Sequence, residues 1–183
     1  MPIPRTTNMK PRPAHPPSCV IDIDIEIRSA DWQVVTELSD LAHRCILAAQ
    51  AHYCPRAFSE ISLMFTDNAH IQDLNRDYRG QDKPTNVLSF PTVTDPTVTE
   101  IELPGQNDVV LGDVVLAFET VAGEALAQGI SLETHISHLL IHGYLHLQGL
   151  DHETEQEALV MEALEIKLLA GLGIANPYDR DAV

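Results

Sequence analysis

Three histidines in one short stretch have the residue types and the spacing of a metal site. His142 and His146 are four residues apart, so on a helix both imidazoles leave the same face. Such a helix would stop at Gly149, and a turn there would return His152 as a third imidazole. Zinc prefers nitrogen ligands of this kind, and three protein ligands leave a fourth position open for water or substrate. The stretch therefore predicts an open site of zinc type at His142, His146 and His152.

The full pattern, H-x3-H-x2-G-x2-D-H, has the histidine spacing of the metzincin proteases but lacks one of their catalytic groups. Those proteases carry a glutamate, their general base, directly after the first histidine, and this chain has Gly143 there. The interpretation without chemistry is a histidine-rich, solvated helix that also carries His135 and His138 on the same stripe. Asp151 could orient a ligand or a water molecule, and it could equally cap the helix end.

A second stretch concentrates positive charge, which is scarce in this chain. There are 11 lysines and arginines against 27 aspartates and glutamates, yet Arg76, Arg79 and Lys83 lie close together in a segment expected to be a loop. An arginine can hold a phosphate with two hydrogen bonds, so this group would suit an anion. The equally weighted alternative is a surface ion network with the neighbouring acids Asp73, Asp77 and Asp82.

The charge balance limits which partners the chain could bind unaided. A net charge of −16 argues against a general nucleic-acid-binding protein, because phosphate contacts require lysine and arginine. A nucleic-acid role would have to depend on a local basic group, or on a partner that delivers the substrate. We expect no DNA binding.

The bulk composition indicates one globular domain in a reducing compartment. A length of 183 residues suits a single core, and 44% hydrophobic residues argue against general disorder. No apolar run of roughly 18 residues is present, so no membrane span is expected, and no secretory signal is visible. Three cysteines, an odd number without metal-finger spacing, favour the cytoplasm. We expect a proline-rich disordered tail at 1–18, the domain at 19–178 and a C-terminal tail at 179–183.

The remaining patterns place secondary structure around the histidines. Strands are expected at 20–27, 58–65, 86–90 and 109–117. Helices are expected from a cap at Ser29 or Asp31 to about 53, from 66 or 67 to about 75, at 119–128, from a cap at Ser131 to about 147, and at 154–170. Gly112 indicates a bulge or a close backbone approach, and Asp113 faces either the metal region or a local turn. The order predicts an α+β domain with a small mixed sheet of about four strands and about five helices, the central one bearing the metal.

Three separate motifs, in this order, resemble those of the bacterial YbeY family. They are Leu74-Asn75…Tyr78-Arg79…Pro84-Thr85-Asn86-Val87-Leu88-Ser89-Phe90-Pro91, then Leu111-Gly112-Asp113, then the histidine motif. The resemblance runs from about residue 20 to Tyr178 and implies a single-domain, zinc-dependent endoribonuclease and rRNA maturation factor. Many members have an aspartate at the position of Asn86, so no base is expected there.

The resemblance also implies roles for individual residues. His142, His146 and His152 would bind one zinc ion per chain, and Arg79 would lie near the metal and act in catalysis by contacting RNA phosphate. The substrate would be single-stranded RNA, notably the 3′ end of the 16S rRNA precursor, with a further role in ribosome quality control. The small ribosomal subunit and its assembly factors would be partners. Two alternatives remain, a non-catalytic assembly factor with a structural metal and a metalloprotease-like hydrolase.

Overall fold

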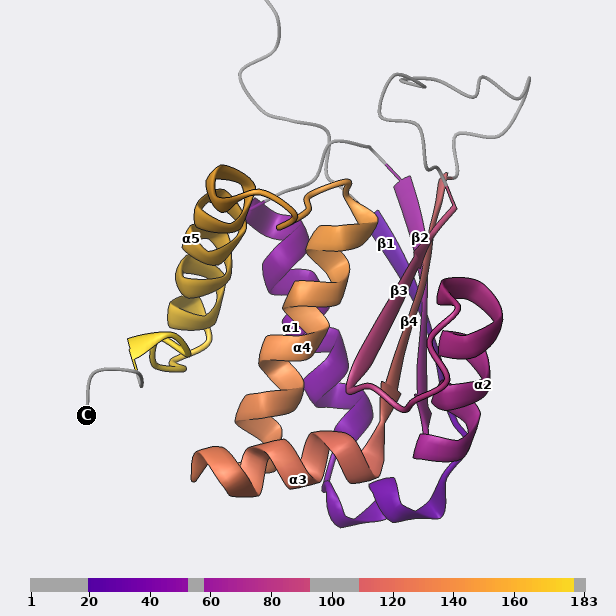
Figure 1. Cartoon of the computed structure of the whole chain (residues 1–183). Coiled ribbons are helices and arrows are strands. Elements are labelled where there is room, and N and C mark those ends of the chain that lie inside the picture. Colours follow the sequence, from indigo (N-terminus) through magenta and orange to yellow (C-terminus); the bar gives the residue numbers. More distant parts are fainter. Residues whose placement is uncertain (1–19, 53–57, 93–108, 180–183) are drawn as a thin grey trace, which may run out of the picture.

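A computed structural model describes residues 20–52, 58–92 and 109–179 (Figure 1). The tail expected at 1–18, all but the first residue of the tail expected at 179–183, and most of the loop expected at 92–107 lie outside these described residues. Within the described ranges, no helix combines the length and the apolar character that crossing a lipid bilayer requires.

The core of the fold is a mixed sheet with the strand order β1-β2-β4-β3. The strands β1 (Val20–Ile27), β2 (Phe58–Thr66) and β4 (Val109–Ala117) run parallel. The short strand β3 (Val87–Pro91) pairs antiparallel with β4 and forms one edge of the sheet. All four strands begin within a residue or so of their predicted positions.

The burial of the strands follows from their sequence patterns. In β1, Ile21, Ile23 and Ile25 pack toward the core while the alternating acids face solvent, as expected for a strand with one wet face. In the second half of β4 both faces are covered: Val114 and Leu116 join the main core, and Val115 and Ala117 join a smaller core on the other side. A strand buried on both faces reads as a nearly continuous apolar run, which β4 does.

Helices cover both faces of the sheet, unequally. The α-helices are α1 (Leu38–His52), α2 (Asn68–Arg79), α3 (Phe118–Gln128), α4 (Leu132–Leu147) and α5 (Glu155–Gly171). Helix α2 lies alone on one side of the sheet, and α1 and α4 lie on the other, with α5 outside them (Figure 1). Helix α4 packs against α1, α3, α5, β3 and β4. The predicted α+β fold with four strands, five helices and a central histidine-bearing helix is confirmed.

The first helix begins later than predicted. Ser29 does act as a cap, but it caps a short 3-10 helix (Ala30–Val34) rather than the long helix. Val35 is then extended, and Glu37 adopts a left-handed φ of 58°, so the chain breaks before α1 starts at Leu38. The apolar spacing continues across this break, which is why the pattern alone suggested one helix.

The second helix extends further than predicted. Asp67 caps it as expected, its side chain accepting from the backbone N–H of His70, but α2 continues past Asn75 to Arg79. Gly80 ends it with a left-handed φ of 67°. Arg79 therefore lies on the last helical turn, where the sequence predicted a loop.

Gly112 combines the two features predicted for it. The register between β2 and β4 slips after Glu60, which leaves Leu111 as the extra residue of a β-bulge. Gly112 has a φ of 136°, and a Cβ there would lie 2.1 Å from the carbonyl oxygen of Phe90. No side chain fits this close approach of β4 to β3.

Candidate metal centre

The end of helix α4 delivers the three histidines to one place. Ser131 caps the helix, its hydroxyl accepting from the N–H of Thr134, and the helix is buried over most of its surface. Gly149 then takes a left-handed φ of 84°, which lets the chain reverse as predicted. The N–H of Leu150 bonds back to the carbonyl of Leu145, so this turn is closed by the helix itself. His152 follows directly.

The histidine cluster, His142, His146 and His152, has ligand atoms that all lie within 4.8 Å of one another. Among the described residues, no other group of three or more His, Cys, Asp or Glu side chains converges in this way. The Nε2 atoms of His142 and His146 are 3.1 Å apart. Two nitrogens bound to one tetrahedral zinc at about 2.0–2.1 Å lie roughly 3.3–3.4 Å apart, so the spacing fits such an ion.

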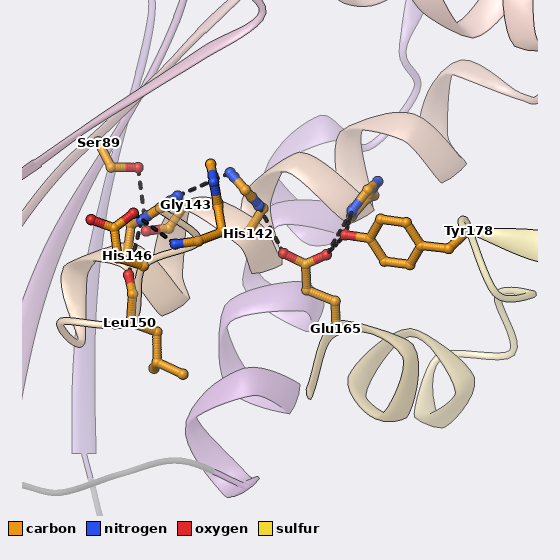
Figure 2. A network of polar contacts seen from close by, with 10 residues as sticks. Ser89, His142, Gly143, His146, Leu150, Glu165 and Tyr178 are labelled. Atoms are coloured by element: carbon orange, nitrogen blue, oxygen red, sulfur yellow. Dashed lines mark hydrogen bonds and ion pairs between the residues drawn. The ribbon is translucent and has the colours of Figure 1, made fainter. Parts of the chain in front are cut away.

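The hydrogen bonds of the two helical histidines decide which nitrogens face the centre of the cluster. Nδ1 of His142 lies 2.7 Å from Oε1 of Glu165, and Nδ1 of His146 lies 3.0 Å from the carbonyl oxygen of Leu150 (Figure 2). A carboxylate and a carbonyl only accept, so in a neutral ring each Nδ1 carries the hydrogen. Both Nε2 atoms then present lone pairs to each other. A cation between them would relieve this repulsion, and the residues present therefore fit a metal.

The environment keeps His146 ready to act as a ligand. Burial, reinforced by the neighbouring His142 and His152, lowers the pKa of His146 from 6.5 to about 4. The ring is therefore neutral at neutral pH, which is the form that binds a metal. His152, by contrast, is exposed, and Oδ1 of Asp151 accepts from its backbone N–H at 2.8 Å. Asp151 thus holds the backbone at His152.

A buried acid network lies behind His142. Glu165 of α5 is only 1% exposed, and it accepts hydrogen bonds from His142, from Nε2 of His138 at 3.0 Å and from the hydroxyl of Tyr178 (Figure 2). Burial alone raises the pKa of the Glu165 carboxyl, but these three hydrogen bonds outweigh it and hold the pKa at about 2. Burial and the adjacent carboxylate raise the pKa of Tyr178, which stays a donor. His142 therefore faces an ionised carboxylate.

Gly143 has a packing role that explains why no glutamate stands there. A Cβ at this position would lie 2.7 Å from Cγ1 of Val114, a fully buried side chain of β4. The carbonyl of Gly143 also accepts from the hydroxyl of Ser89 on β3 at 3.3 Å (Figure 2). The position faces the sheet, and the close contact between helix and sheet excludes the base that metzincin proteases place there.

Comparison with known proteins places the chain in a family. The family model described as "Endoribonuclease YbeY" matches residues 24–173, which is most of the chain and includes the whole histidine cluster. The chain belongs to the YbeY family. The predicted resemblance is thereby confirmed at the level of the family.

Individual YbeY relatives are similar over most of their own length. The protein named "Endoribonuclease YbeY" of Paramagnetospirillum magneticum is 46% identical over 86% of this chain and 96% of its own. The protein of the same name from Sphingopyxis alaskensis is 52% identical, over 67% of this chain and 73% of its own. The solution structure of TM1509 from Thermotoga maritima, at 19% identity and a TM-score of 0.51, covers 88% of this chain and 96% of its own, and supports the fold alone.

Of the three clustered cations Arg76, Arg79 and Lys83, only Arg76 forms ion pairs in the described structure. Arg76 bonds to Asp73 at 2.8 Å and to Asp77 at 3.0 Å, which is the surface network that the sequence left open as an alternative. Arg79 and Lys83 are exposed, and their side chains form no ion pair or hydrogen bond within the described part of the chain. Helices α2 and α4 lie on opposite faces of the sheet (Figure 1), and no contact joins Arg79 to the three histidines in the described structure, contrary to the expectation that Arg79 lies near the metal.

Asn86, His135 and Asp113, which were singled out from the sequence, are not part of the histidine cluster. The side-chain amide of Asn86 donates to Glu124 on α3 at 2.9 Å, and Glu124 also binds Nε2 of His135 at 2.7 Å. Asp113 is exposed and alternates with Val114, so it faces the α2 side of the sheet rather than the metal region. The possibility that Asp113 supports the site is therefore wrong.

Glu165 and Tyr178 were not identified as site residues from the sequence. A signal for Glu165 was nevertheless present, because it follows Met161 by four residues and precedes Leu168 by three on the buried stripe of α5. A charged residue at a core position is rarely tolerated without partners. No local pattern points to Tyr178, whose hydroxyl reaches Glu165 through the tertiary fold.

Proposed function

We propose that this chain is a zinc-dependent, single-strand-specific endoribonuclease. It acts in the cytoplasm, in 3′-end maturation of 16S rRNA and in ribosome quality control, together with the small ribosomal subunit and its assembly factors. The observation that carries the proposal is the convergence of His142, His146 and His152, whose ligand atoms lie within 4.8 Å of one another, with the Nε2 atoms of the first two 3.1 Å apart. Structural zinc sites usually have four protein ligands, and this cluster offers three among the described residues.

The residues of the chain have separate roles in the proposed reaction. His142, His146 and His152 would hold the ion, whose bound form supplies Lewis-acid chemistry toward water and a phosphoryl oxygen. Arg79 lies across the sheet from the histidines (Figure 1), so it would bind a phosphate oxygen of the RNA away from the ion and hold the strand in place. The relatives named "Endoribonuclease YbeY" support RNA as the substrate class.

The proposal is tested by incubating the zinc-loaded protein with a single-stranded fragment of precursor 16S rRNA and with the same fragment annealed to its complement. We expect cleavage of the single strand and an intact duplex. Cleavage only after small ribosomal subunits are added would mean that a partner delivers the RNA. Bound zinc without cleavage in either condition would contradict the enzymatic proposal and favour the non-catalytic assembly factor.

Replacing Arg79 with alanine is expected to lower kcat/KM for RNA cleavage by about tenfold or more. The reason is the loss of a charge-assisted hydrogen bond to phosphate, which contributes about 1.5–3 kcal/mol. Arg76→Ala is the matched control, because Arg76 is on the same helix but is occupied by Asp73 and Asp77. Zinc content and melting temperature should be unchanged in both variants. An equal effect of the two substitutions would argue against a specific role of Arg79.

A further inference from the structure

The aromatic ring of Tyr78, on the last turn of α2, is exposed to solvent. Tyr78 is 72% exposed, whereas tyrosine is more commonly at least half covered in folded proteins. Its ring meets that of Phe90 on β3 at a centroid distance of 5.1 Å and an interplanar angle of 62°. Its hydroxyl has no hydrogen-bond partner among the described residues. The ring is therefore supported on one side by Phe90 and open over most of its surface.

Two cations near Tyr78 in the sequence, Arg79 and Lys83, have no acidic partner in the described structure. Arg79 follows Tyr78 directly, and Lys83 lies on the loop after α2. The aspartates nearby are already engaged: two pair with Arg76, and Asp82 accepts from the side-chain amide of Gln72 at 2.9 Å. In a chain with a net charge of −16, two unpaired cations that share the end of α2 and the following loop with an open ring suit an anion that carries a flat group.

The loop that carries Lys83 is held in place by its own hydrogen bonds. The buried Asn75 donates its side-chain amide to the carbonyl of Lys83 at 2.8 Å. The backbone N–H of Gln81 donates to the carbonyl of Asn75 at 3.2 Å, and that of Lys83 donates to the carbonyl of Gln81 at 2.9 Å. Tyr78 and Lys83 are thus presented from a fixed backbone, which lowers the entropic cost of binding.

Strand β3 connects this surface to the histidine cluster. Phe90, which supports the tyrosine ring, follows Ser89, whose hydroxyl donates to the carbonyl of Gly143 on the opposite face. Because β3 is an edge strand, no further strand covers its outer side in the described structure. A flexible chain bound at Tyr78 could therefore cross this edge and reach His142, whereas helices α2 and α4 themselves are separated by the sheet (Figure 1).

We propose that Tyr78 is a stacking platform for one base of the single-stranded RNA substrate, with Arg79 and Lys83 on the neighbouring phosphates. This inference rests on the proposed function and deepens it. Every base has a flat π-face, so stacking tolerates any sequence, and a base within a duplex is already stacked and cannot reach the ring. The site gives a strongly acidic chain a way to hold RNA, and it favours single strands.

The test is a scan with abasic nucleotides. A fluorescein-labelled ten-nucleotide single-stranded RNA is made in versions that each lack one base, and binding to zinc-loaded protein is read by stopped-flow anisotropy before cleavage proceeds. We expect one abasic position to weaken binding to the unmodified protein and to Tyr78→Phe by about fivefold or more. The same position should have no effect on Tyr78→Ala. Lys83→Ala should weaken all versions equally, because a phosphate contact does not depend on the base.

The outcomes separate this inference from the proposed function. Equal sensitivity of Tyr78→Ala and the unmodified protein at every abasic position overturns the stacking site, even when both cleave RNA. A position-specific loss that disappears in Tyr78→Ala supports it, even when no cleavage is seen and the proposed enzyme activity fails. Absence of RNA binding by the unmodified protein overturns the stacking site, whereas the proposed function still holds if cleavage is seen once small ribosomal subunits are added. Melting temperatures confirm that Tyr78→Ala is folded, as the 72% exposure of the ring predicts.

Discussion

Replacing His146 with alanine is expected to release the bound zinc and to abolish RNA cleavage. The Nε2 atom of His146 lies 3.1 Å from that of His142, and a pKa of about 4 keeps the ring neutral and able to bind. The substitution leaves two of three ligands. Losing the ion forfeits several kcal/mol of transition-state stabilisation, which corresponds to a rate loss of roughly 1,000-fold or more. Elemental analysis and the cleavage assay measure both effects on one preparation, purified without a histidine tag.

The control for His146→Ala is His43→Ala. His43 is an exposed histidine on α1 whose Nδ1 donates to the carbonyl of Ser39, far from the histidine cluster in the sequence. This variant should keep one zinc per chain and full activity. Full cleavage by a zinc-free His146→Ala protein would contradict a metal-dependent reaction. Unchanged zinc affinity would instead contradict the assignment of His146 as a ligand.

The secondary structure could be predicted where apolar residues recur at a regular period. The prediction failed where no such period exists. The alternation in β1 and the apolar run of β4 each gave the correct strand, because burial follows directly from those patterns. The predicted end of helix α2 came too early because the apolar period of the sequence stops before Asn75. Asn75 is polar but buried, and its side-chain amide donates to the carbonyl of Lys83. Glu37 carries no sequence signal for its left-handed φ of 58°, so the break before α1 was missed.

The candidate site divides in the same way between local and distant contacts. The convergence of His142, His146 and His152 needs only one helical turn and one glycine turn, so the spacing was enough to predict it. The partner of His142 comes from another helix, and no local rule pairs Glu165 with a histidine 23 residues earlier. Arg79 was identified from a motif, but its place across the sheet from the histidines depends on which face α2 covers.

Replacing Glu165 with glutamine is expected to weaken zinc binding by up to about 100-fold. The ionised carboxylate fixes His142 with its hydrogen on Nδ1 and makes Nε2 more basic toward a metal. A glutamine has nearly the same shape but no charge, and its NH2 group would face the donors His138 or Tyr178 in place of an acceptor. Competition with a chromophoric chelator measures the zinc affinity directly, without relying on activity.

Two companion variants decide whether Glu165 acts through His142 or only through charge. Glu162→Gln removes the same charge from α5. Glu162 acts on Tyr178 only through its charge, which raises the pKa of that hydroxyl, and it bonds to no histidine in the described structure, so the zinc affinity should be unchanged. Tyr178→Phe removes one of the hydrogen bonds that hold the carboxylate, so we expect a smaller loss, below about tenfold. Equal affinities for Glu165→Gln and Glu162→Gln would show that the carboxylate does not orient the ligand. The graded series would instead mean that α5 and Tyr178 help to set how tightly the histidines hold their metal.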